Sequence, residues 1–86
     1  MAIKFTESAG KHGFTERDAI HAMTNARITR KDFDESRVGG TRPTLYVGPS
    51  LTPSAPLIEV MALIEEPSTV VIFHVMRARE KFLPET

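Results

Sequence analysis

The amino-acid sequence predicts an α+β fold, in which N-terminal helices pack on one face of a small curved antiparallel sheet. Three observations support this class: a capped amphipathic segment near the N-terminus, an alternating apolar segment over residues 57–65, and a run rich in β-branched residues over 69–77. The expected order of elements is β-α-α-β-β-β-β. All 86 residues, 1–86, are expected to form a single domain, because so short a chain buries only roughly 60–65% of its unfolded surface.

The first residues are expected to form an edge strand and a short helix. Residues 3–5 alternate between apolar and charged side chains, as short strands do. Residues 6–13 then indicate one or two helical turns, with Thr6 as the N-cap and Gly13 as a left-handed stop.

The second helix has a clear start signal. Thr15 is a favourable N-cap, and Asp18 takes the place of the usual glutamate in a capping box. Phe14 precedes the cap, where a hydrophobic staple would lie. The apolar stripe that follows has helical spacing and consists of Ala19, Ile20, Met23 and Ala26. This stripe predicts which side of the helix packs on the sheet.

Four segments after this helix are expected to form strands. In chain order they are a weak candidate within 27–33 and three stronger ones over 44–47, 57–65 and 69–77. Glycines, prolines and serines mark the connections, which are expected at residues 34–42, 48–56 and 66–68. A last helical turn is expected over residues 79–83.

Alternation within the strands assigns side chains to the two faces of the sheet. The face expected to pack on the helices carries Ile58, Val60, Ala62, Ile64, Val71, Phe73, Val75, Leu45 and Val47. The other face is expected to carry Tyr46, Glu59 and His74. It also receives the apolar side chains Leu57, Met61, Leu63, Ile72 and Met76. A small sheet that is apolar on both faces often covers the second face with another chain, so a partner protein or a homodimer is expected there.

Composition excludes several kinds of site. Eleven basic residues balance eleven acidic ones, so net charge gives no argument for nucleic-acid binding. The chain has no cysteine, which excludes disulfides and thiolate zinc sites, and its three histidines lack ligand spacing. Neither a metal nor a cofactor is therefore expected. Because no apolar run approaches the ~20 residues of a membrane span, and no signal peptide opens the chain, a cytoplasmic location is expected.

The C-terminal strand combines a histidine with three cations. His74 lies in an apolar run that ends in Arg77, Arg79 and Lys81, so one edge of the sheet should receive groups able to hold a phosphate and move a proton. Glu59 or Tyr46 on the same face is a candidate substitute acid or base. The alternative interpretation is structural, with His74 as a neutral core histidine and the cations extending from a strand end into solvent.

A second pair, Lys11 and His12, precedes Gly13 near the N-terminus. It offers another proton-transfer group and another cation for a phosphodiester. The structural alternative is that basic residues and a glycine simply suit the C-terminal end of a helix.

The motifs together resemble a known family. Lys11-His12-Gly13 followed by Asp18-Ala19 is similar to the K-H-G-x(4)-D-A opening of the BrnT toxins, in the RelE-like superfamily of bacterial toxin–antitoxin ribonucleases. Arg42 and Gly48 resemble that family's R-x(5)-G strand. Met76-Arg77-Ala78-Arg79 resembles its I-S-A-R strand end, which places Arg79 on the family arginine. Residues 74–82 also resemble the H-x-M-x-x-R-x-K-F ending of short, divergent BrnT-like proteins.

The chain departs from the family in three respects. It lacks the N-terminal Trp-Asp strand and the long C-terminal helix, and Arg77 replaces the serine of the strand end. The resemblance implies cleavage of messenger RNA without a metal, and masking by a DNA-binding antitoxin.

On this basis we expect an endoribonuclease in which the ribose 2′-hydroxyl attacks the adjacent phosphorus. Arg79 and Arg77 are the expected phosphate clamps, with Lys81 and Lys11 as supporting cations. His12 and His74 are the expected acid and base. Two alternatives stay open: a catalytically inert interaction module, such as a degenerate toxin or co-repressor subunit, and a dimeric structural protein.

Overall fold

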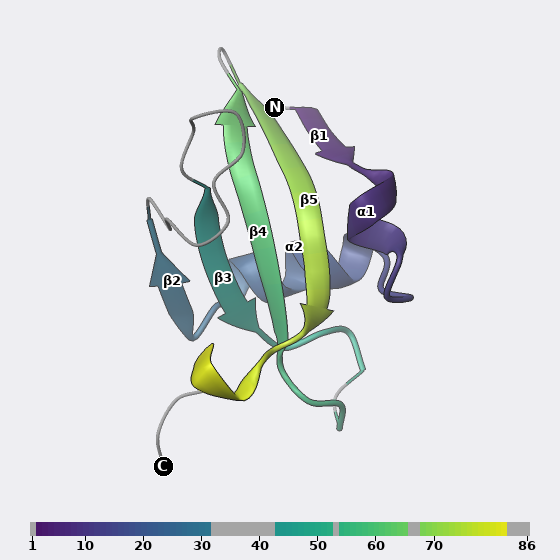
Figure 1. The fold of residues 1–86 in the computed structure, drawn as a ribbon, viewed down its shortest axis with the longest axis vertical. Helices are drawn as coiled ribbons and strands as arrows, with labels where there is room; N and C mark the ends of the chain where they lie inside the picture. Colours follow the sequence, from purple (N-terminus) through teal and green to yellow (C-terminus); the bar gives the residue numbers. More distant parts are fainter. Residues whose placement is uncertain (1, 32–42, 53, 66–67, 83–86) are drawn as a thin grey trace.

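The computed structural model describes residues 2–31, 43–52, 54–65 and 68–82, which form a five-stranded sheet and two helices (Figure 1). The strands are β1 (Ala2–Phe5), β2 (Ile28–Arg30), β3 (Thr44–Gly48), β4 (Ile58–Glu65) and β5 (Thr69–Arg77). Helix α1 spans Glu7–Gly10, helix α2 spans Glu16–Thr24, and a terminal 3-10 turn, η2, spans Glu80–Phe82. The α+β class and the order β-α-α-β-β-β-β are confirmed. The expected loop at 34–42 lies outside the described residues.

The sheet is mixed, with strand order β1-β5-β4-β3-β2. Strands β2 to β5 form the predicted antiparallel meander, and β4 and β5 are neighbours along their full length. The prediction of a purely antiparallel sheet was wrong, because β1 pairs in parallel with β5. A parallel pair needs a long connection, and both helices and three strands separate β1 from β5 in the chain.

Helix α2 crosses one face of the sheet behind β3, β4 and β5 (Figure 1). Its predicted capping box is present: the Thr15 hydroxyl accepts from the Asp18 N–H at 3.1 Å, and the Asp18 carboxylate accepts from the Thr15 N–H at 3.0 Å. Gly48 allows the helix to approach β3 closely. A Cβ atom at this position would lie 2.4 Å from the Ala22 carbonyl oxygen, so only glycine fits here.

Helix α1 is shorter than predicted. Thr6 is its N-cap, as expected, but the helix ends at Gly10 with Lys11 as the C-cap. Gly13 has the predicted left-handed backbone, with a φ of 87°, and its N–H donates to the Gly10 carbonyl at 3.1 Å. The predicted glycine stop therefore closes the turn after the helix rather than the helix itself.

The main core lies between α2 and the sheet. Its buried members are Ala9, Ala19, Ala22, Ile58, Val60, Ala62, Val70, Ile72 and Val75. Ile64 was expected here and is instead 62% exposed. It is the next-to-last residue of β4, and this end of the strand lies away from α2 (Figure 1).

The predicted faces were wrong for two strands. On β3, Tyr46 packs against the helix-side core, whereas Leu45 and Val47 lie on the opposite side of the sheet. On β5, Val70 and Ile72 face the helix, because a bulge interrupts simple alternation. His74 is paired with Met61 and Ile72 with Ala62, so Phe73 is an extra residue between them. A two-residue period alone cannot reveal such an insertion.

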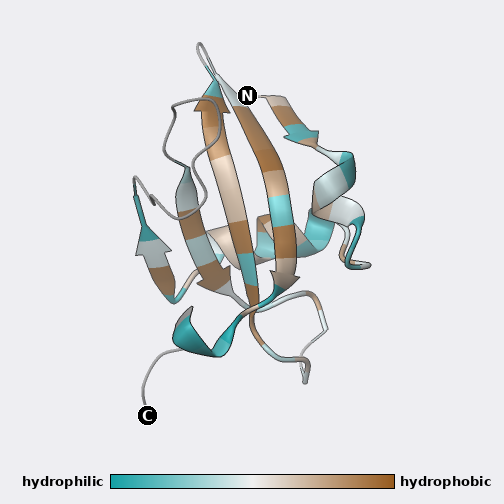
Figure 2. Cartoon of the chain, viewed as in Figure 1, coloured by the Kyte–Doolittle hydropathy of each residue, from teal (hydrophilic) through white to brown (hydrophobic). Residues whose placement is uncertain are grey.

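The face of the sheet away from α2, called the open face below, has its own small core. Leu45, Val47, Met61 and Ala78 are buried there, with Ile28, Leu57 and Phe73 packed against them. The apolar surface expected to bind a partner is thus smaller than predicted, since Met61 is 0% exposed and Ile72 lies on the helix side. Hydrophobic residues follow β3, β4 and β5, while η2 is hydrophilic (Figure 2). In the described part of the chain, no helix is long and apolar enough to cross a membrane.

Candidate functional site

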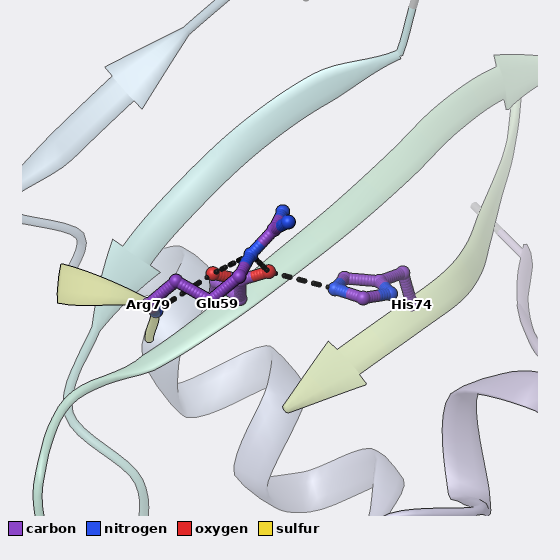
Figure 3. A network of polar contacts seen from close by, with 3 residues as sticks. All are labelled: Glu59, His74 and Arg79. Atoms are coloured by element: carbon purple, nitrogen blue, oxygen red, sulfur yellow. Dashed lines mark hydrogen bonds and ion pairs between the residues drawn. The ribbon is translucent and has the colours of Figure 1, made fainter. Parts of the chain in front are cut away.

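Three polar side chains meet on the open face: Glu59 from β4, His74 from β5 and Arg79 from the segment after β5 (Figure 3). The Glu59 carboxylate is the centre of this cluster and is 0% exposed. Its Oε1 atom lies 2.8 Å from Nε2 of His74. The side chains of His74 and Arg79 keep 27% and 38% of their surface exposed. The cluster therefore has a buried acid beneath two basic groups that reach solvent.

Arg79 binds the carboxylate with both its backbone and its side chain. The backbone N–H donates to Oε2 at 3.0 Å, and the guanidinium Nε donates to Oε1 and Oε2 at 3.1 and 3.3 Å. The residue before it, Ala78, still donates to the Leu57 carbonyl at 2.9 Å, as a strand residue would. At Arg79, the backbone N–H donates to the Glu59 carboxylate instead of to a carbonyl of the neighbouring strand. The buried acid thus fixes the point at which the chain leaves the sheet.

The pKa of Glu59 is held below its ordinary value. Burial alone would raise this pKa, because it penalises the charged carboxylate. The hydrogen bonds from His74 and Arg79, together with the positive charge of the guanidinium, outweigh burial. Glu59 is therefore ionised, and an ionised carboxylate only accepts hydrogen bonds. We assign the proton of this hydrogen bond to Nε2 of His74, which leaves Nδ1 as the second ring nitrogen for other chemistry.

The bulge in β5 positions His74, and two hydrogen bonds from Thr6 and Ser8 stabilise the bulge. Ser8 donates through its hydroxyl to the carbonyl of Phe73 at 2.8 Å, and the Thr6 N–H donates to the carbonyl of Ile72 at 3.0 Å. Both contacts exist because β1 lies beside β5 and delivers α1 to this position. No local pattern indicates a role for Ser8, since its partner lies 65 positions away in the chain.

The structure brings together only some of the predicted site residues. Glu59, His74 and Arg79 converge as expected, but Tyr46 lies on the opposite face and cannot act with them. Arg77 is paired with Ile58, whose side chain is in the helix-side core, and its own side chain is exposed at the end of β5. Lys81 lies in η2 and is exposed.

Lys11 and His12 lie apart from the cluster. Both are exposed in the turn after α1, and within the described residues neither forms a hydrogen bond or an ion pair with Glu59, His74 or Arg79. The described part of the chain also contains no group of three or more histidine or acidic residues able to hold a metal ion.

Comparison with known proteins gives no relative: no protein-family model, curated protein or solved structure matches the chain.

Proposed function

We propose that this protein is a metal-independent endoribonuclease and the toxin component of a toxin–antitoxin pair. The observation that carries the proposal is the cluster on the open face, in which one buried carboxylate orients both a histidine and an arginine toward solvent. A histidine held by a carboxylate is suited to proton transfer, and a guanidinium is suited to binding a phosphate. The motif resemblance to the BrnT toxins supports the same function.

In the proposed reaction the ribose 2′-oxygen forms a bond to the adjacent phosphorus, and the bond from phosphorus to the 5′-oxygen breaks. His74 takes the 2′ proton through Nδ1. Arg79 stabilises the negative charge that grows on the phosphoryl oxygens. The leaving 5′-oxygen takes its proton from solvent water, because the other predicted acid, His12, lies apart from the cluster. Lys11 and Lys81 add positive charge for the RNA backbone.

Glu59 has a different role from the one expected. Because it is fully buried and already accepts from two residues, it does not act as an acid or base on the substrate. We propose that it is a positioning residue. It fixes the His74 tautomer and the direction of the Arg79 side chain, as carboxylates do for catalytic histidines.

The test is cleavage of RNA by the purified full chain, alone and with ribosomes. We expect products with a 2′,3′-cyclic phosphate and a 5′-hydroxyl, formed equally well with and without a chelator. His74→Ala should lower cleavage by on the order of 10²–10⁴-fold, the usual contribution of a proton-transfer group. His21→Ala, which changes a histidine of α2, is the matched control and should cleave like the unchanged protein. RNA that stays intact both with the chain alone and with ribosomes would contradict the proposed ribonuclease activity.

A catalytically inert interaction module is the second candidate. It is favoured by the same carboxylate, since a buried carboxylate whose hydrogen bonds are satisfied also occurs where only structure is required. This module would bind a DNA-binding antitoxin without cleaving RNA. Co-purification with the product of an adjacent small gene, together with intact RNA, would favour it over the enzyme.

A further inference from the structure

A hollow lies beside Arg79 at the end of the sheet, and the reaction described above does not use it. It measures about 540 Å³ and is lined by Pro56, Leu57, Arg77, Ala78 and Glu80. This size falls within the roughly 300–1,000 Å³ typical of sites for small organic ligands. The hollow therefore has room for a nucleobase.

The hollow lies next to the cluster of Glu59, His74 and Arg79. Ala78 and Glu80 are the chain neighbours of Arg79, so the hollow begins within one residue of the proposed phosphate clamp. Leu57 and Ala78 belong to the open-face core, and the hydrogen bond between them at 2.9 Å holds these two walls together. A nucleotide with its phosphate at Arg79 would place its base within reach of these walls.

The two charged residues of the hollow are available to a ligand. Arg77 and Glu80 are exposed and of opposite charge. Nevertheless, neither makes a hydrogen bond or an ion pair within the described part of the chain. Both charged residues line the hollow, while Pro56, Leu57 and Ala78 provide apolar walls.

We propose that this hollow is a subsite for the base of an RNA nucleotide and that it prefers guanine. The inference rests on the proposed function and extends it to substrate selection. Guanine presents two adjacent donors, N1–H and the N2 amino group, which match the two oxygens of the Glu80 carboxylate. Its O6 and N7 atoms are acceptors for Arg77, the side-chain type that most often reads them. Single-stranded RNA exposes both of these edges.

The other bases fit the same pair of charges less well. Adenine and cytosine each place a ring acceptor beside their amino group, and that acceptor would face the carboxylate. Uracil has one donor between two carbonyl acceptors. Each of these bases therefore leaves an oxygen of the Glu80 carboxylate opposite an acceptor. We expect guanine to bind about tenfold or more tightly than the other bases.

The experiment measures binding rather than cleavage. Dinucleotides with a 2′-O-methyl group, which blocks attack on the phosphorus, are titrated into the full chain, with each of the four bases at the 5′ position. Amide NMR shifts of Leu57 and Ala78 should report binding in the hollow, and the guanine form should bind at least about tenfold more tightly than the others.

Glu80→Gln should reduce the preference for guanine to about twofold or less, because an amide places a donor against one of the two guanine donors. Glu65→Gln is the matched control. It changes an exposed glutamate at the opposite end of β4 and should leave the preference unchanged.

The outcomes separate the subsite from the enzyme. Guanine-selective binding at Leu57 and Ala78, by a protein that leaves RNA intact, would support the guanine subsite and contradict the proposed ribonuclease activity. Equal binding of all four bases, or a preference that survives in Glu80→Gln, would overturn the subsite even if RNA is cleaved. Shifts confined to His74 and Arg79 would overturn it as well.

Discussion

The two faces of the sheet bury their side chains by different means. The helix side of β4 contributes Ile58, Val60 and Ala62, which pack against α2 and gain stability from the apolar area removed from water. The open side of the same strand buries Glu59 completely, and this is favourable only because His74 and Arg79 surround its charge. Apolar side chains of similar volume often stabilise a protein as well as a buried ion network does. Stability alone therefore gives little reason for the charge, which is why the proposed function is placed on the open face.

The largest expected effect on stability comes from removing the buried charge. Glu59→Ala removes the hydrogen-bond acceptor shared by His74 and Arg79 and leaves a cavity in place of a fully buried side chain, so it should lower the free energy of unfolding by about 3 kcal/mol. Val60→Ala is the matched change on the other face of the same strand, where the loss should be about 2 kcal/mol. Urea unfolding followed by circular dichroism measures both. A smaller loss for Glu59→Ala than for Val60→Ala would show that the network contributes less than ordinary packing.

The second prediction concerns the contact between α2 and β3. Gly48→Ala would place a methyl group 2.4 Å from the Ala22 carbonyl oxygen, so the helix must shift. Overpacking of this kind costs about 1–3 kcal/mol. Gly10→Ala is the control, because its Cβ would make an ordinary contact at 3.4 Å with Phe5. Equal melting temperatures for Gly48→Ala and the unchanged protein would contradict the close approach of the helix.

The third prediction concerns the hydrogen bond between Ser8 and the bulge in β5. Ser8→Ala removes the donor to the Phe73 carbonyl and should cost about 1 kcal/mol. It should also change the NMR chemical shifts of the His74 ring, because the bulge sets the position of that side chain. Ser54→Ala, in an exposed loop, is expected to change neither property. Unchanged chemical shifts of the His74 ring would show that the bulge keeps its shape without this contact from α1.

The smallest expected effect is on the pH dependence of stability. Glu59 and Asp18 both have a lowered pKa in the folded protein: His74 and Arg79 lower it for Glu59, and the Thr15 N–H lowers it for Asp18. Each carboxyl group therefore stabilises the fold above its unfolded pKa, about 4. That contribution is lost as the pH falls through the folded value. Denaturant midpoints measured from pH 6 to pH 2 should fall less steeply in Glu59→Gln and in Asp18→Asn. Curves parallel to that of the unchanged protein would contradict the assignment.

These two faces also show what a sequence can predict. The capping box at Thr15 and the strands over 57–65 and 69–77 follow from local pattern, and the structure contains all three. Tyr46 and Ile72 were predicted on the wrong face of the sheet. Alternation gives the two faces of each strand but does not relate the faces of one strand to those of the next. It also does not indicate an inserted residue such as Phe73.

The candidate site was predictable only in part. Glu59, His74 and Arg79 stood out as polar residues in or next to apolar strands. The parallel pairing of β1 with β5, which brings Ser8 to the bulge, depends on contacts between distant parts of the chain. Pattern within a segment cannot supply that information.

Cleavage of RNA by Arg79 variants tests the central claim most directly. Arg79→Lys keeps the charge beside Glu59 but loses the planar fork, so a folded variant should retain only part of the activity. Arg79→Ala should lower cleavage by on the order of 10²–10³-fold, about 3–4 kcal/mol of transition-state stabilisation.

Two further variants separate chemistry from folding. The double variant Glu59→Gln with Arg79→Ala avoids an unpaired buried charge and should be equally inactive, whereas Arg17→Ala on α2 is the control and should remain active. Folding of each variant is checked by amide NMR. Progressive loss from the unchanged protein through Arg79→Lys to Arg79→Ala, in folded proteins, is the predicted result. Full activity in a folded Arg79→Ala variant would contradict the assignment of the open-face cluster as the active site.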